Sequence, residues 1–369
     1  MTIGVLKEPS FETRVSLLDE AVATLTKKGI QVLIEKSAGE KAFCTDAAYE
    51  KAGASIADRA QVLKTSDIVL AIHRPAGDEA LQLVSKILVG VYQPLSDAEP
   101  IKKWAAAGLS VFSLDMLPRT TRAQAMDVLS SQANIAGYKA VLTAANSYGR
   151  YFPMFMTAAG SIAPAKVLIL GAGVAGLQAI ATAKRLGAVV EVFDTRPAVK
   201  EEVMSLGAKF IEVEGAADAS KAGGYAVEQS EDFMKRQKER IAASAQKSDI
   251  IITTAQIPGK KAPILIDENM IASMRNGSVI IDLAAATGGN TPYTKNNETI
   301  TQNGVIIIGN SNLQATMPAD ASKLYGKNVL NFLQLIITKE NAINLNWEDD
   351  LVKGSCIAHS GQITNERIK

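Results

Sequence analysis

Short apolar runs alternate with amphipathic stretches over the N-terminal part of the chain. The apolar runs predict strands at 3–7, 31–35, 68–73, 87–92 and 109–114. The stretches between them have helical periodicity at 16–28, 47–53 and 98–107. Strands separated by helices are typical of a parallel sheet with right-handed crossovers. The pattern therefore predicts an α/β fold for this part of the chain.

A second strand–helix–strand pattern begins at position 167. The apolar run 167–170 predicts a buried strand, and 177–186 predicts a helix that ends before a glycine at 187. A further strand at 189–193 ends on Asp194. Between the first strand and the helix, Gly171, Gly173 and Gly176 stand in G-x-G-x-x-G spacing. This order of elements is the one that a dinucleotide-binding motif requires.

Each residue of this motif has a role if the ligand is a dinucleotide. Gly171 permits the tight turn, Gly173 lets the backbone approach the pyrophosphate, and Gly176 lets the helix pack against the strand. Asp194 can bind both ribose hydroxyls of the adenosine half, and its charge repels a 2′-phosphate. Arg196 lies two residues further and favours the opposite choice, but the acid holds the strand end, so we expect NAD. A glycine turn that binds nothing is the alternative.

The remaining elements divide the chain into two domains. A proline-free periodic stretch at 122–148 predicts a helix that links them, and a helix at 319–337 returns to the first domain. The second domain continues with a helix at 197–206 and strands at 209–213, 249–254, 278–284 and 305–309. We predict two doubly wound, Rossmann-like domains with a cleft between them: a discontinuous domain of 1–129 plus 319–369, and a dinucleotide-binding domain of 130–318. The first domain has Lys7, Glu8 and Pro9 where a glycine motif would stand.

The region 214–247 differs from its surroundings. It contains two adjacent glycines within 222–226, followed by a charge-rich helical pattern at 228–247. Its composition is compatible with a solvated surface excursion and, equally, with a functional flap.

Composition excludes several classes of protein. The chain has 369 residues, with 39 basic and 38 acidic side chains, which argues against a nucleic-acid-binding surface. Cys44 and Cys356 form no C-x-x-C pair, so we expect buried thiols rather than a metal site or a disulfide. We expect no signal peptide and no membrane span, and a reducing compartment. Only His73 and His359 are available for histidine acid–base chemistry.

Several motifs together carry a resemblance to a known family. They are RTTRAQAMDVLSSQ (119–132), GAGVAG (171–176) with FDTR (193–196), AGGYA (222–226), IPGKKAP (257–263) and GSVIIDLA (277–284). With them the chain resembles, almost end to end, the NAD(H)-binding component of proton-translocating NAD(P)+ transhydrogenase. The alanine dehydrogenases are wider relatives, which share the opening KEP…ETR (7–14) and the two-domain plan.

The resemblance implies an oxidoreductase that is active only with partners. NADH is expected on this chain, and NADP+ on a separate component at a proton-translocating membrane component. Hydride then passes directly between the two nicotinamides. The family also implies a homodimer, attached through its partners to the cytoplasmic face of the inner membrane.

The resemblance also assigns site residues. Arg119, Gln124, Asp127 and Ser130 match the nicotinamide-side positions: Arg119 meets the carboxamide or a phosphate, and Gln124 and Asp127 orient the ring. From the residues alone, Arg119 and Asp127 are equally a helix-cap ion pair. Gly224 and Tyr225 match a loop that closes over the cofactor, with Gln237 beside it. The expected cofactor-binding set is Gly171, Gly173, Val174, Gly176, Asp194, Thr195, Arg196, Gly224, Tyr225, Gln237 and Gln256, and no metal is expected.

Departures from alanine dehydrogenase separate the two enzyme types. Reduction of an imine or ketone needs a proton donor. Gln93 stands where those enzymes keep a histidine, Ala286 where they keep an acid, and His73 where a lysine grips the substrate. Arg14 remains and, like Lys7, is then expected to be a structural ion-pair residue. An alanine dehydrogenase-like oxidoreductase is the alternative, and a non-enzymatic NAD sensor or scaffold is a third hypothesis.

Overall fold

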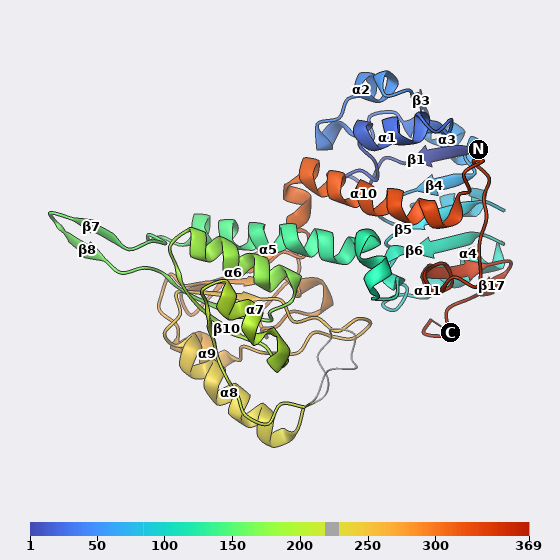
Figure 1. Cartoon of the computed structure of the whole chain (residues 1–369). Coiled ribbons are helices and arrows are strands. Elements are labelled where there is room, and N and C mark those ends of the chain that lie inside the picture. Colours follow the sequence, from blue (N-terminus) through green and yellow to red (C-terminus); the bar gives the residue numbers. More distant parts are fainter. Residues whose placement is uncertain (84, 218–228, 369) are drawn as a thin grey trace. The chain divides into compact units, whose positions relative to one another are not determined.

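The computed structural model describes residues 1–83, 85–217 and 229–368. The chain forms two compact units, each containing a large, mainly parallel sheet (Figure 1). Unit 1 consists of Met1–Gln132 with Ala315–Lys369, and unit 2 of Ala133–Gln314. The α/β fold agrees with the prediction, and the unit boundaries lie near the predicted 129/130 and 318/319.

Unit 1 contains an eight-stranded sheet in the order β17-β16-β6-β5-β4-β1-β2-β3. From β3 to β6 all neighbours are parallel, and β16 and β17 are added antiparallel at one edge. The strands are β1 (Thr2–Val5), β2 (Gln31–Glu35), β3 (Ser55–Ala57), β4 (Ile68–Leu70), β5 (Ile87–Gly90), β6 (Ser110–Ser113), β16 (Cys356–His359) and β17 (Gln362–Ile363).

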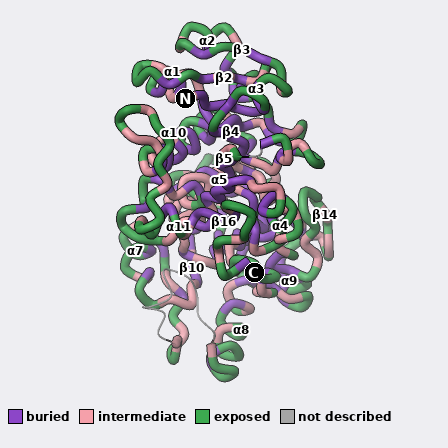
Figure 2. Tube along the Cα trace, turned by 90° about the vertical axis from the view of Figure 1, so that its right-hand side faces the viewer, coloured by how far each residue is buried: buried purple, intermediate pink, exposed green. Residues whose placement is uncertain are grey.

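Helices cover both faces of this sheet. They are α1 (Asp19–Thr26), α2 (Asp46–Lys51), α3 (Arg59–Thr65), α4 (Glu99–Ala106), α10 (Pro318–Ile336) and α11 (Asp350–Ser355). Short 3₁₀ helices lie at η1 (Glu40–Ala42), η2 (Glu79–Leu83), η3 (Leu114–Met116) and η4 (Thr121–Met126). Side chains of β5 alternate between two cores, since Ile87 and Val89 join one and Leu88 the other. A strand buried on both faces reads as a continuous apolar run, and β4 and β5 are accordingly buried throughout (Figure 2).

Unit 2 contains a seven-stranded sheet in the order β11-β10-β9-β12-β13-β15-β14. Its strands are β9 (Lys166–Leu170), β10 (Val189–Phe193), β11 (Lys209–Phe210), β12 (Ile250–Thr253), β13 (Val279–Asp282), β14 (Glu298–Gln302) and β15 (Val305–Gly309). Only β14 is antiparallel to its neighbour. The helices are α6 (Val174–Arg185), α7 (Lys200–Ser205), α8 (Glu231–Ala245) and α9 (Glu268–Ser273), with 3₁₀ turns at Pro197–Val199 and Ala285–Thr287.

The long connecting helix begins later than predicted. A single helix was expected over 122–148, but the structure has the 3₁₀ helix η4, a break at Asp127, and then α5 (Val128–Ser147). The carboxylate of Asp127 accepts a hydrogen bond from the Ser130 amide and so caps α5. The apolar periodicity continues across this cap, which explains why the pattern alone did not reveal it.

Two further features were not predicted. A separate hairpin of β7 (Phe155–Thr157) and β8 (Gly160–Ile162) follows α5. The edge strand β14 is half-exposed and mixes polar with apolar residues. Cys44 and Cys356 are free and buried, as expected. Within the described residues, no helix has both the length and the apolar character needed to cross a bilayer.

Candidate functional site

The junction between β9 and α6 shows why each glycine of the motif is a glycine. Gly171 has a φ of 104°, and a Cβ there would lie 2.3 Å from the Thr254 hydroxyl oxygen. A Cβ on Gly176 would lie 1.9 Å from the carbonyl oxygen of Gly171, so the helix packs directly on the turn. These contacts leave no room for a side chain at either position.

Gly173 is a glycine for a different reason. Its φ is −77°, which any residue adopts, and no described heavy atom lies within 4 Å of where its Cβ would stand. The missing side chain therefore leaves open space at the N-terminus of α6. The first N–H groups of a helix have no partner within the helix and carry a partial positive charge. This end of α6 can accordingly bind an anionic group such as a pyrophosphate.

Asp194 connects the end of β10 to the glycine turn. One carboxylate oxygen accepts hydrogen bonds from the Arg196 amide (2.8 Å) and Nε (2.9 Å). The other accepts from the Ala172 amide at 2.7 Å and from Arg196 Nη2 at 2.8 Å. These hydrogen bonds raise the pKa of the Arg196 guanidinium. In this arrangement Asp194 and Arg196 act as a pair rather than as competing ribose and 2′-phosphate ligands.

The other predicted residues of unit 2 have varied surroundings. Val174 is the first residue of α6, and Thr195, half-buried, follows Asp194. Gln256 is exposed just after β12 and donates a hydrogen bond to the Leu283 carbonyl at 2.6 Å. Gln237 is half-buried on α8. Gly224 and Tyr225, and the rest of the predicted flap at 218–228, lie outside the described residues.

A buried polar network at the ends of β12 and β13 has almost no signal in the sequence and was not predicted. Asp282 is fully buried and accepts hydrogen bonds from the Asn290 amide and the Thr294 hydroxyl, both at 2.6 Å. The Asn290 side chain donates to the carbonyls of Ala255 and Pro263. This network fixes the loop that contains Gln256. Its one trace in the sequence is an acid that ends the apolar run of GSVIIDLA.

In unit 1, the structure brings three of the four predicted nicotinamide-side residues together. Asp127 accepts hydrogen bonds from the Ser130 amide (2.9 Å) and hydroxyl (2.6 Å), and Arg119 Nη2 lies 3.9 Å from its carboxylate. The helix-cap ion pair that the residues alone suggested is therefore present. Gln124 is exposed on η4, and its carbonyl accepts a hydrogen bond from the Asp127 amide.

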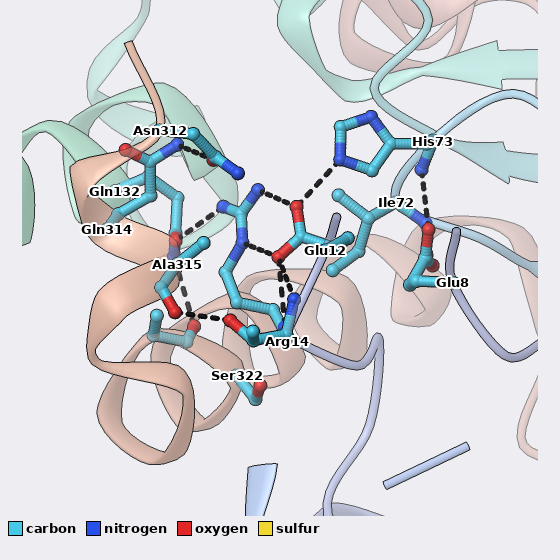
Figure 3. A network of polar contacts seen from close by, with 12 residues as sticks. Glu8, Glu12, Arg14, Ile72, His73, Gln132, Asn312, Gln314, Ala315 and Ser322 are labelled. Carbon is cyan, nitrogen blue, oxygen red and sulfur yellow. Dashed lines mark hydrogen bonds and ion pairs between the residues drawn. The ribbon is translucent and has the colours of Figure 1, made fainter. Parts of the chain in front are cut away.

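A second network in unit 1 is centred on a buried acid, Glu12 (Figure 3). Arg14 donates from Nε and Nη2 to the two oxygens of Glu12, and His73 Nε2 lies 2.7 Å from one of them. Burial alone would raise the pKa of Glu12, but the hydrogen bonds from Arg14 and His73 hold it well below its ordinary value. Arg14 is therefore an ion-pair residue, as predicted. For Lys7 that prediction is wrong, because it forms no ion pair with any described residue.

Family models match nearly the whole chain. Alanine dehydrogenase/PNT, N-terminal domain, matches residues 4–136, and Alanine dehydrogenase/PNT, C-terminal domain, matches residues 140–366. The chain belongs to the alanine dehydrogenase/PNT family. The resemblance inferred from the motifs is thereby confirmed.

Individual members of this family differ in how similar they are. A chain of NAD(P) transhydrogenase subunit alpha from Rhodospirillum rubrum is 44% identical over 380 residues, covering 100% of this chain and 99% of that protein. A crystal structure of transhydrogenase from Sinorhizobium meliloti matches with a TM-score of 0.90 and 42% identity, covering 98% of this chain and 100% of that one. Alanine dehydrogenase of Staphylococcus epidermidis is 26% identical, covering 100% of this chain and 96% of that protein. The transhydrogenase class is therefore the better supported.

Proposed function

We propose that this chain is the NAD(H)-binding subunit of a proton-translocating NAD(P)+ transhydrogenase, which passes hydride directly between NADH and NADP+ held on a partner component. The observation that carries the proposal is the β9–α6 junction. There, Gly171 and Gly176 are fixed by close contacts, while Gly173 leaves the helix N-terminus open for a pyrophosphate. The 44% identity to a transhydrogenase alpha subunit adds the enzyme class.

The choice of NAD over NADP rests on the Asp194–Arg196 pair. Both oxygens of Asp194 already accept hydrogen bonds, so binding ribose hydroxyls requires Arg196 to release part of the carboxylate. A guanidinium held against this acid is poorly placed to receive a 2′-phosphate. We expect Val174, Thr195, Gln237 and Gln256 to complete the cofactor site with the glycines, and Gly224 and Tyr225 to close over it.

The reacting end of the cofactor is assigned to Arg119, Gln124, Asp127 and Ser130. Bound NADH supplies the hydride, and these side chains hold the ring in position for the transfer. Asp127 is itself held by the Ser130 hydrogen bonds, so its carboxylate has a defined orientation. Transfer between two nicotinamides requires no proton donor at the reacting carbon, which is consistent with Gln93 and Ala286 at the positions where alanine dehydrogenases keep a histidine and an acid.

Nucleotide binding tests the cofactor part of this proposal. Because a hydrogen bond to a carboxylate contributes about 1.5–3 kcal/mol, Asp194→Ala should weaken NADH roughly 10- to 150-fold. The wild-type chain should bind NADPH much more weakly than NADH. Equal affinity for the two nucleotides would refute the assignment of Asp194.

Turnover tests the reaction. The purified chain should bind NADH but should not oxidise it with pyruvate and ammonia. Addition of an NADP-loaded partner component should produce rapid hydride exchange between the nucleotides. Oxidation of NADH by the chain alone with pyruvate and ammonia would favour the alanine dehydrogenase alternative. NADH binding without turnover in either assay would favour a sensor or scaffold.

We further propose a homodimer, attached to the cytoplasmic face of the inner membrane through its partner subunits, and we assign the β7–β8 hairpin to the dimer interface. Met154, Phe155 and Met156 are 63%, 45% and 74% exposed, and no charged residue lies between Arg150 and Lys166. An isolated two-stranded hairpin is only marginally stable in water. A second copy fits this surface because an uncharged apolar hairpin is self-complementary about a two-fold axis.

Sedimentation tests the interface. The wild-type chain should be a dimer at micromolar concentration, and Met156→Asp should shift it toward monomer. Met204→Asp is the matched control, since Met204 is 55% exposed on α7, away from the hairpin in sequence. A monomeric wild-type chain, or a Met156→Asp variant that stays dimeric, would refute the assignment.

A further inference from the structure

The segment that contains the four nicotinamide-side residues is anchored on its other face. Ala123, Met126 and Val128 are 3%, 8% and 1% exposed and belong to the main core of unit 1. Arg119 and Gln124 are exposed. The apolar contacts hold the segment on the core, but they do not by themselves fix the orientation of its backbone.

Asn328 supplies directional contacts to this segment. It is 7% exposed on α10, and its Nδ2 donates a hydrogen bond to the Ala125 carbonyl at 2.8 Å. Its Oδ1 accepts one from the Ser131 hydroxyl at 2.7 Å. The reversed amide would place one carbonyl oxygen against another, so the hydrogen bonds define its orientation. One buried amide therefore joins the residue after Gln124 to the residue after Ser130.

The surroundings of Asn328 make it a rigid anchor. Its neighbour Val329 and, one turn on, Phe332 are buried in the core, and the ring of Phe332 lies 5.4 Å from that of Phe112 on β6. Asn331 donates a second, longer hydrogen bond to the Ala125 carbonyl, at 3.1 Å, from a half-buried position. Of these two asparagines, Asn328 is the one that connects both ends of the segment.

We propose that Asn328, acting with Ser131, is a positioning residue for hydride transfer. The inference rests on the proposed function. The two hydrogen bonds fix the turn of η4 relative to the first turn of α5, and thereby fix Gln124 relative to Asp127 and Ser130. A misplacement of about 1 Å at a reacting site can lower a rate on the order of 100-fold. The adenosine half of the cofactor site lies in unit 2 and does not depend on this amide.

The test combines hydride exchange with NADH binding, using the full chain and the NADP-loaded partner. Asn328→Ala should lower the exchange rate roughly 10- to 100-fold while the Kd for NADH changes by less than about threefold. Asn331→Ala is the matched control, because it removes only the longer bond to the same carbonyl, and it should change the rate by less than about threefold.

A second pair of variants keeps the test independent of folding at position 328. Ser131→Ala removes the hydroxyl bonded to Asn328 and should lower exchange, and Ser131→Thr, which retains a hydroxyl, should restore most of the rate. Unchanged exchange in a folded Asn328→Ala or in Ser131→Ala would overturn the positioning role. So would a parallel fall of exchange and NADH affinity, or failure of Ser131→Thr to restore the rate. Failure of the proposed function is distinguishable, because the wild-type chain would then show no exchange.

Discussion

The two units have similar central strands but treat the end of the strand differently. After β9, a short glycine turn leads into α6 at Val174. After β1, the next helix starts only at Asp19, and a carboxylate occupies the strand end. Both oxygens of Glu8 accept hydrogen bonds there, from the amides of Ile72 (2.6 Å) and His73 (3.0 Å), just after β4.

The comparison separates topology from binding. In both sheets the chain first adds strands on one side of the central strand and then on the other, which creates a switch point where ligands commonly bind. In unit 1 the backbone amides at this point are satisfied by the chain's own acid. In unit 2 the helix N-terminus is open beside Gly173. Topology thus indicates where an anion can bind, and the residues after the strand decide whether a place remains for it.

The largest expected effect is at Gly176. In Gly176→Ala the new methyl group would meet the Gly171 carbonyl, so α6 must shift away from the turn. We expect a loss of about 1–3 kcal/mol in the free energy of unfolding, and a fall in NADH affinity on the order of 100-fold. Chemical denaturation and equilibrium NADH binding provide the two measurements.

Gly173→Ala is the matched control for this variant. The backbone at Gly173 accepts alanine, and no described atom lies within 4 Å of the added carbon. Stability should change by less than about 0.5 kcal/mol, while NADH affinity should fall about tenfold because the methyl group takes space expected for the pyrophosphate. Unchanged NADH affinity would mean that the open space beside Gly173 is not the phosphate site.

The next effect concerns the pH dependence of unit 1. Burial raises the pKa of Glu8 from 4.5 to about 7, although the amides of His73 and Ile72 act in the opposite direction. Between these two values the folded chain binds more protons than the unfolded chain, so the free energy of unfolding falls as pH rises, by up to about 3 kcal/mol. The lowered pKa of Glu12 acts in more acidic solution, where stability is lost as pH falls.

Glu8→Gln should remove this dependence. Urea unfolding at pH 5 and pH 8 should show a clear loss of stability in the wild-type chain and almost none in the variant. An equal loss in both proteins would show that another group titrates in this range. NADH affinity should be the same in both, since Glu8 lies outside the glycine motif.

The smallest effect is expected at Lys7. It is exposed and forms no ion pair with any described residue. Lys7→Ala should change the free energy of unfolding by less than about 0.5 kcal/mol and leave NADH binding unchanged. A loss above about 1 kcal/mol on chemical denaturation would show that this lysine has a structural partner after all.

The sequence predicted best the parts whose burial is reflected in a continuous apolar run. The strands expected at 31–35 and 305–309 are found as Gln31–Glu35 and Val305–Gly309. The hairpin β7–β8 is fully or mostly exposed, so no internal packing pattern marks it. Short helices such as α3 and α9 were missed although Asp58 and Asp267 cap them, because each is too short to show an apolar period.

For the candidate site, the limits of prediction from sequence lie in distance along the chain. The glycine motif is local, and its steric basis was predictable from spacing. The pairing of Asp194 with Arg196 was not foreseen, because two neighbouring ligands with opposite preferences read as competitors. Asn328 lies far along the chain from Ala125 and Ser131, and Asn290 is likewise distant from Ala255. Polar contacts between distant segments leave no periodic signal.

The discontinuity of unit 1 has a consequence for the order in which the protein is made. The sheet of unit 1 acquires β16 beside β6, and its core acquires Phe332, only from the segment after Ala315. Unit 2 is contiguous and emerges complete from the ribosome before that segment is synthesised. Since domains generally fold as units during synthesis, the second unit should become folded first. The first must wait with exposed apolar strands, which makes it the region most dependent on chaperones.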